Sequence, residues 1–192
     1  MSSHHFVREG QEPALLIDTH DVSNFSFLDQ IAAWNPVVIA MERSVPTLIA
    51  NSIHIDYLLT REDADTWYPV LSYFPKLKIH TCPEDYFGAA LSKIVSGSAS
   101  NEVHVLRDEL MPEEIDKLRF DNVRITVFTP GAKWIFVQNG EYRSWFAAES
   151  RIMLRGKGIS VNGAAIEGDY TANEDALLRI HGAGSFWVGV DL

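Results

Sequence analysis

Cysteine is almost absent from the sequence, with Cys82 as the single example in 192 residues. One cysteine excludes an internal disulfide framework and any zinc site built from paired cysteines. Cys82 is interpreted as a structural thiol, because no histidine and acid can be tied to it from the sequence beyond His80, two residues away. A lone thiol is typical of a reducing compartment, so we expect a cytoplasmic protein.

Long apolar runs and an excess of basic residues are also missing. No stretch approaches the ~20 apolar residues that span a bilayer, and Met1 to His5 do not begin a signal peptide. The chain has 16 Lys and Arg against 26 Asp and Glu, which gives a net charge of −10. It therefore lacks the basic surface that nucleic acid or an acidic membrane would require, and we expect neither as a partner.

Glycine-rich phosphate-binding loops are absent as well. The turns that follow the first two predicted strands read Asp18-Thr19-His20-Asp21 and Glu42-Arg43-Ser44-Val45. Neither turn fits the dinucleotide-binding fingerprint or the P-loop, which both need closely spaced glycines between a strand and a helix.

What the sequence does contain is an alternation of apolar strands and amphipathic helices in its first half. Strands are expected at Ala14–Ile17, Pro36–Met41, Ile53–Leu59 and Lys76–Thr81. Helices are expected between and after them, at Ser26–Trp34 with Ser26 as a cap, Val45–Asn51, Glu62–Tyr73 and Asp85–Val95. This order predicts an α/β half, with a mostly parallel sheet covered by helices on both faces.

The second half changes in character. A strand at Glu102–Leu106, a short helix at Pro112–Leu118 and a strand at Val123–Phe128 are followed almost entirely by short strands. Nine of the 12 glycines lie beyond residue 130, where they mark turns such as Asn139-Gly140. We therefore predict an α/β domain over residues 1–120 and an all-β C-terminal sandwich over residues 121–192.

Acidic side chains follow two of the predicted strands. Asp18, His20 and Asp21 come directly after the first one, where two carboxylates and an imidazole would suit a metal. The alternative is that an aspartate caps the next turn and that His20 is solvated.

A second acidic group surrounds the third strand: Asp56, Glu62, Asp63 and Asp65. These carboxylates either coordinate Mg²⁺, which prefers oxygen ligands, or occupy the first turn of a helix, where negative charge meets the positive end of the dipole.

The order of these parts resembles the thiamine pyrophosphokinase family. The segment Asn35 to Asp63 is similar in spacing to that family's run from a strand ending in Asp-Gly-Gly to a strand ending in Gly-Asp-Phe-Asp-Ser. Glu42 stands at the position of the first aspartate, and Arg43-Ser44 replace the two glycines. Asp63 matches in the second motif, in which Arg61 replaces an aspartate, and Asp85 is similar to the aspartate of Thr-Asp-x-x-Lys-Ala-Leu.

The β half carries a further likeness. Thr171-Ala172-Asn173-Glu174 resembles the family's Thr-Ser-Asn-Glu, which helps to form a thiamine pocket between two subunits. The family's Gly-Gly-Arg-x-Asp-His and Gly-Leu-Lys-Trp stretches have no counterpart in this chain.

The resemblance implies an enzyme that transfers the diphosphate of ATP to thiamine with Mg²⁺, and a homodimer. It implies catalytic roles for Glu42, Asp63 and Asp85, with Asp63 and Asp85 as metal ligands, and places Arg61, Thr171 and Asn173 at the substrates. A second hypothesis is a non-catalytic relative that binds a small ligand or a protein partner. Arg61 favours this second hypothesis, because it puts a cation where the family has a metal ligand, although it could instead contact a phosphate.

Overall fold

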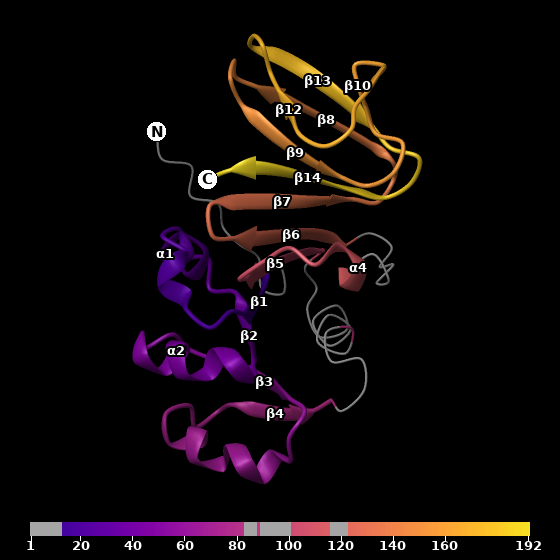
Figure 1. Cartoon of the computed structure of the whole chain (residues 1–192). Helices are drawn as coiled ribbons and strands as arrows, with labels where there is room; N and C mark the ends of the chain where they lie inside the picture. The colour runs from indigo at the N-terminus through magenta and orange to yellow at the C-terminus, as the bar shows by residue number, and fades with distance from the viewer. Residues whose placement is uncertain (1–12, 83–87, 89–100, 116–122) are drawn as a thin grey trace.

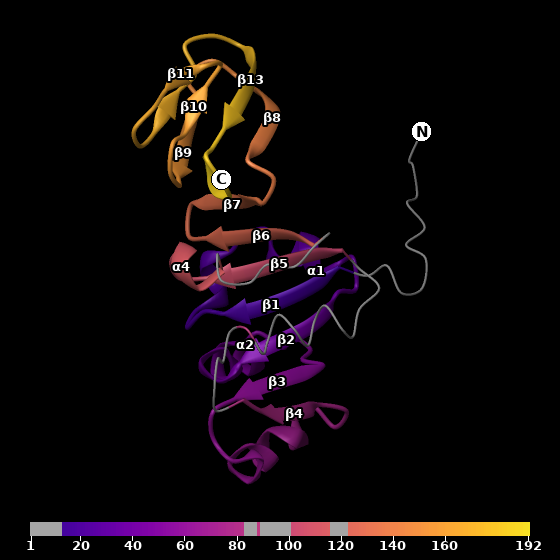
Figure 2. The same cartoon turned by 90° about the vertical axis from the view of Figure 1, so that its right-hand side faces the viewer.

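The structure is a computed structural model that describes residues 13–82, 88, 101–115 and 123–192. Its largest element is a ten-stranded sheet with the strand order β12-β9-β14-β7-β6-β5-β1-β2-β3-β4. A second sheet has four strands in the order β11-β10-β13-β8. Figures 1 and 2 show the second sheet stacked beside the antiparallel end of the first.

The first half of the chain supplies the parallel strands of the large sheet. They are β1 (Ala14–Asp18), β2 (Val37–Met41), β3 (Tyr57–Thr60), β4 (Lys78–Thr81), β5 (Glu102–Arg107) and β6 (Arg124–Thr129). Neighbours pair in parallel from β4 through β3, β2, β1 and β5 to β6. The apolar runs in β1 and β2 are buried, as expected of strands covered on both faces.

The described helices are short: those before β4 lie on one side of the parallel strands, and the one after β5 lies on the other (Figure 1). They are the α-helices α1 (Leu28–Ala32), α2 (Val45–Ala50) and α4 (Pro112–Ile115), and the 3₁₀ helices η1 (Val22–Asn24), η2 (Glu42–Ser44) and η3 (Ala64–Ser72). Leu28, Leu48 and Phe74 share a core with Leu15 and Ile17 of β1. The predicted helix Asp85–Val95 lies outside the described residues, so helices on both faces stay a prediction.

Three sequence predictions need correction. The third helix is a 3₁₀ helix, η3, in which Pro69 removes a backbone N–H donor. The third strand begins at Tyr57 rather than Ile53, although the preceding Ile55 is fully buried. The first helix has Phe27, not Ser26, at its N-cap, with no side-chain hydrogen bond there.

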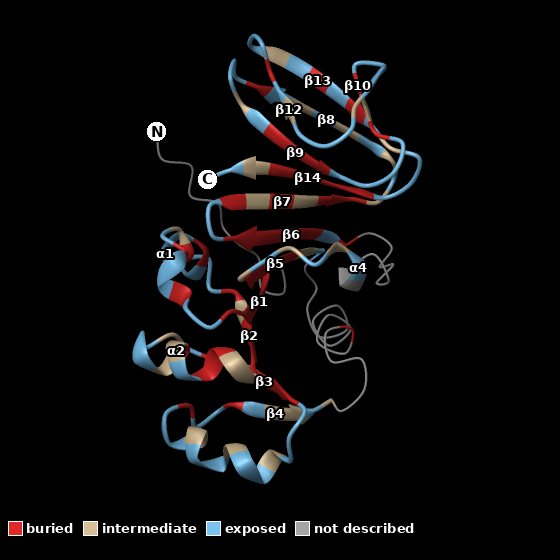
Figure 3. Cartoon of the chain, viewed as in Figure 1, coloured by how far each residue is buried: buried red, intermediate tan, exposed pale blue. Residues whose placement is uncertain are grey.

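Beyond β6 every strand pairs antiparallel; some of these strands continue the large sheet and the others form a second one. The strands β7 (Ala132–Val137), β14 (Phe186–Asp191), β9 (Arg151–Arg155) and β12 (Tyr170–Thr171) continue the large sheet. The strands β8 (Glu141–Phe146), β13 (Ala176–His181), β10 (Ser160–Val161) and β11 (Ala164–Ala165) form the second. Phe146 and Ile180 of the second sheet share a buried core with Ile152 and Phe186 of the first. Figure 3 shows buried residues in red on the strands of both sheets.

The large sheet runs without a break from the parallel strands into the antiparallel ones. β6 pairs in parallel with β5 on one side and antiparallel with β7 on the other. The division into residues 1–120 and 121–192 therefore stays a prediction. Within the described part of the chain, no helix has the length and apolar character needed to cross a membrane.

Substitution of Gly189 in β14 provides a test of the packing between this strand and β7. A Cβ atom at position 189 would lie 2.6 Å from ring carbons of Trp134, a buried side chain on β7. We expect Gly189→Ala to lower the free energy of unfolding by about 1–3 kcal/mol, because the ring has to shift. Gly184→Ala is the matched control, since nothing lies within 4 Å of a Cβ there. Equal denaturation midpoints for the two variants would contradict this packing.

His104 in β5 makes stability depend on pH. Its side chain is 9% exposed and lies 3.2 Å from Glu102; burial lowers its pKa, an effect that the Glu102 carboxylate opposes. A lowered pKa means that the folded state favours the neutral ring. The stability of the folded state is therefore unaffected by His104 protonation above about pH 6.5 and decreases as the pH falls below that value. Denaturation at pH 7.5 and 5.5 should show a smaller pH effect in His104→Gln, whereas His54→Gln should behave as wild type because His54 is exposed.

Candidate functional site

The candidate site lies where the strand order reverses. From β1 the chain continues to β2, β3 and β4 on one side, and later adds β5 and β6 on the other. Ligands of open α/β sheets bind at such a switch point, outside the carboxyl ends of the strands. Asp18, the last residue of β1, is the register partner of Arg107, the last residue of β5, so both side chains leave the sheet at this point.

Asp18 is a buried carboxylate held between two arginines. Nε of Arg43, just after β2, donates to Asp18 Oδ1 at 2.5 Å, and Nη2 of Arg43 donates to the Asp18 carbonyl oxygen at 2.6 Å. Nε of Arg107 lies 3.1 Å from Asp18 Oδ2, and both of these side chains are only 7% exposed. Each carboxylate oxygen of Asp18 therefore faces a guanidinium group.

Residues beside Asp18 tie the strand ends together. The Ser44 hydroxyl donates to the Ile17 carbonyl oxygen and accepts from the Thr19 amide, both at 3.0 Å. The Thr19 hydroxyl donates to Asp108 Oδ1, and the His20 amide donates to Asp108 Oδ2 at 3.4 Å. Hydrogen bonds and ion pairs thus connect the ends of β1, β2 and β5.

Glu42 is part of a second group of hydrogen bonds. Its Oε2 accepts from the Thr60 hydroxyl at 2.7 Å and from the Arg61 amide at 3.0 Å. The same Thr60 oxygen accepts from the Glu62 amide at 3.0 Å and from Trp67 Nε1 at 2.9 Å. Glu42 therefore joins the end of β2 to the end of β3.

The other residues singled out by the resemblance are not in these networks. Asp63 is exposed at the N-cap of η3, where its side chain makes no capping hydrogen bond. Asp85 lies outside the described residues. Thr171 and Asn173 are exposed at the far end of the sheet. Six strands lie between β12 and β2, so the two are seven strand spacings apart, roughly 34 Å along the sheet.

For Asp21 and Asp65 the sequence left open whether they bind a metal or stabilise the start of a helix, and the structure supports the second role. Asp21 caps η1 by accepting from the Ser23 amide at 2.9 Å, and this hydrogen bonding lowers the pKa of Asp21. Asp65 lies in the first turn of η3, where its hydrogen bond and charge raise the pKa of Tyr68. Asp56 precedes β3 and accepts from the Val38 amide at 2.9 Å, so its placement beside Asp63 at the strand's end was wrong.

The described residues do not fit a Mg²⁺ site. Among them, no group of three or more Asp, Glu, His or Cys side chains could hold a metal ion. Asp18 faces two arginines, Glu42 is bound to Thr60 and to a backbone amide, and Asp63 lies apart from both networks. The cations at this edge are guanidinium groups.

Sequence reasoning missed Arg43, Arg107 and Asp108 as site residues. Arg107-Asp108 directly follow the predicted strand Glu102–Leu106, so the rule that singled out Asp18 would have found them as well. Arg43 was noted only as a replacement of a glycine.

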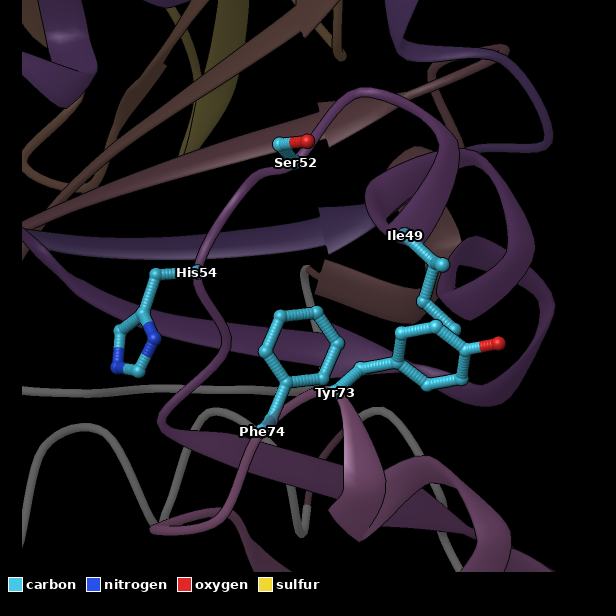
Figure 4. Close-up of a pocket in the computed structure, with 5 residues that line it drawn as sticks. All are labelled: Ile49, Ser52, His54, Tyr73 and Phe74. Atoms are coloured by element: carbon cyan, nitrogen blue, oxygen red, sulfur yellow. The ribbon is translucent and has the colours of Figure 1, made fainter.

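A pocket of about 310 Å³ lies at the opposite edge of the sheet, before β3 (Figure 4). Its lining residues are Ile49, Ser52, His54, Tyr73 and Phe74. His54 Nε2 is 3.2 Å from Asp56 Oδ1, and the His54 ring meets Phe74 edge-on. None of the predicted site residues lines this pocket.

Comparison with known proteins identifies the fold. No protein-family model matches the chain, and no curated protein does. Among solved structures, thiamine pyrophosphokinase from Bacillus subtilis matches with a TM-score of 0.68 and 9% identity, over 94% of this chain and 98% of that chain. The enzyme from Geobacillus thermodenitrificans gives 0.66 and 10% identity, over 93% and 97%. The enzyme from Candida albicans gives 0.62 and 10%, over 94% and 89%.

The fold of the chain follows from these matches. The chain has the thiamine pyrophosphokinase fold, which confirms the resemblance for the fold. Identities of 8–10% with enzymes of this name mark a divergent version of it.

Proposed function

We propose that this chain is a thiamine pyrophosphokinase-like protein that binds a nucleotide such as ATP at the switch point, and that its diphosphate transfer to thiamine is lost or strongly reduced. The observation that carries the proposal is the connected network of Asp18, Arg43, Arg107 and Asp108 at the ends of β1, β2 and β5. It holds cationic donors at the edge where this type of sheet binds ligands, and guanidinium groups are good partners of phosphate oxygens.

The loss of transfer is supported by what Glu42 and Arg61 do. Glu42, at the position of the family's first aspartate, accepts hydrogen bonds that join β2 to β3. Arg61 replaces an acid of the second motif. Phosphoryl transfer depends on positioned charge, and one electrostatic group is often worth ~10²-fold or more in rate. No observation tests Mg²⁺ as a cofactor, so the roles of Asp63 and Asp85 as metal ligands remain predictions.

An active thiamine pyrophosphokinase is the second candidate, favoured by the fold match over nearly the whole chain. To distinguish the two candidate functions, the purified protein is incubated with thiamine, ATP and Mg²⁺, and the thiamine diphosphate formed is measured. We expect no product above the background and a thermal shift with ATP. Product that disappears in Asp63→Ala would show that the transfer is retained.

A homodimer is part of this proposal, as is a cytoplasmic location. Thr171 and Asn173 lie across the sheet from Glu42 and Arg43, so one chain does not bring the two sets into a single pocket. A second copy is the simplest way to do so. Sedimentation equilibrium should give twice the mass of the chain; the mass of a single chain would leave Thr171 and Asn173 without a role at the switch point.

A further inference from the structure

Arg43 is fixed in place by Asp18. Its Nε and one N–H of Nη2 are committed to the Asp18 carboxylate and carbonyl oxygens, at 2.5 and 2.6 Å. Asp18 is in turn held from the other side by the buried Arg107. The guanidinium plane of Arg43 is therefore oriented before any ligand arrives, which reduces the entropy lost on binding.

Three N–H groups of Arg43 remain for a ligand. A guanidinium has five N–H donors, and the two hydrogen bonds to Asp18 use two of them. Nη1 is 3.9 Å from Asp108 Oδ2, beyond hydrogen-bonding distance, and the Arg43 side chain is 35% exposed. Within the described part of the chain, no other acceptor bonds to Nη1 or to the second N–H of Nη2. These donors form a fork of the kind that binds phosphate oxygens in pairs.

The neighbouring carboxylates are already engaged. Both oxygens of Asp18 face arginines, Asp108 accepts from Thr19 and the His20 amide, and Glu42 Oε2 accepts from Thr60 and the Arg61 amide. A divalent cation would have to displace these partners and approach Arg43 against charge repulsion. A phosphate group has the opposite charge to the guanidinium and needs to displace no hydrogen bond at Nη1 and Nη2; the Asp108 carboxylate, 3.9 Å from Nη1, is the like charge beside it.

We propose that the guanidinium of Arg43 takes the role of the divalent cation at this edge, so that the protein binds the phosphate groups of a nucleotide without Mg²⁺. This inference rests on the proposed function, in which the switch point binds a nucleotide. This proposal also explains why the chain has an arginine at position 43, where the family has a glycine: the arginine supplies the positive charge that binds phosphate.

The first test uses the unaltered protein. Isothermal titration with ATP is carried out in excess EDTA and again in excess Mg²⁺. We expect binding in EDTA that is at least as tight as in Mg²⁺. Binding that requires Mg²⁺ would overturn this inference and leave the nucleotide-binding proposal in place. Absence of binding under both conditions would overturn both.

The second test assigns the binding to Arg43. Arg43→Gln should weaken ATP binding in EDTA by about tenfold or more, because charge-assisted hydrogen bonds to phosphate are lost. The matched control is Arg155→Gln, which removes an exposed arginine that is likewise bound to one aspartate, Asp169. Circular dichroism confirms that each variant is folded. Unchanged ATP binding by folded Arg43→Gln would contradict the proposal.

Discussion

Replacement of Asp18 by alanine is expected to lower the free energy of unfolding by about 3–5 kcal/mol, because it removes the carboxylate from a buried ion pair. The partner in question is Arg107, whose side chain is 7% exposed and whose Nε lies 3.1 Å from Asp18 Oδ2. Arg43 loses one hydrogen bond, from its Nε to the Asp18 carboxylate, and keeps the other, because that one goes to the backbone carbonyl oxygen. Its loss costs less than that of Arg107, because the Arg43 side chain is 35% exposed. Urea denaturation followed by circular dichroism measures the effect.

Asp169 provides a matched control for Asp18. It also lies between two arginines, Arg151 at 2.6 Å and Arg155 at 2.8 Å, but all three side chains are partly exposed. Exposed ion pairs contribute little because water and salt screen them. Asp169→Ala should therefore change stability far less than Asp18→Ala. Similar losses in the two variants would mean that Arg107 does not depend on Asp18.

Replacement of Thr60 by valine is expected to have the second-largest effect. Thr60 is fully buried, and its hydroxyl makes hydrogen bonds with Glu42, the Glu62 amide and Trp67 Nε1. Valine keeps the shape of the side chain but leaves these polar groups without their partner, which should cost about 2–4 kcal/mol. The same denaturation experiment measures it.

Thr60→Ser separates the hydroxyl from the methyl group. Serine keeps the donor and acceptor, so it should retain most of the stability that valine loses. We also expect Trp67 fluorescence to change in Thr60→Val, because its indole N–H loses a bond of 2.9 Å. Valine and serine variants of equal stability would contradict the role given to the hydroxyl.

The parallel half of the fold could be predicted because its strands are buried on both faces. β1 and β2 are continuous apolar runs, which are hard to mistake for anything else. β3 was misplaced because Ile55 is as buried as a strand residue but lies in a loop. A buried loop and a buried strand give the same short apolar pattern.

The candidate site could be predicted only in part. The rule that polar residues at strand ends meet at one edge correctly singled out Asp18. It did not show that the carboxylate would be neutralised, since Arg107 is 89 residues away in sequence and an arginine at a strand end is ordinarily exposed. The ion pair between Asp18 and Arg107 forms because β5 lies next to β1 in the sheet, and this strand order could not be predicted from the local sequence.

Divalent cation binding tests most directly whether arginine has replaced metal at the switch point. Mn²⁺, added to the full chain, is followed by its electron paramagnetic resonance signal, which falls when the ion is bound. We expect the signal of free Mn²⁺ to persist at protein concentrations in the micromolar range. One Mn²⁺ bound per chain at such concentrations, and displaced by Mg²⁺, would contradict the replacement of metal by arginine.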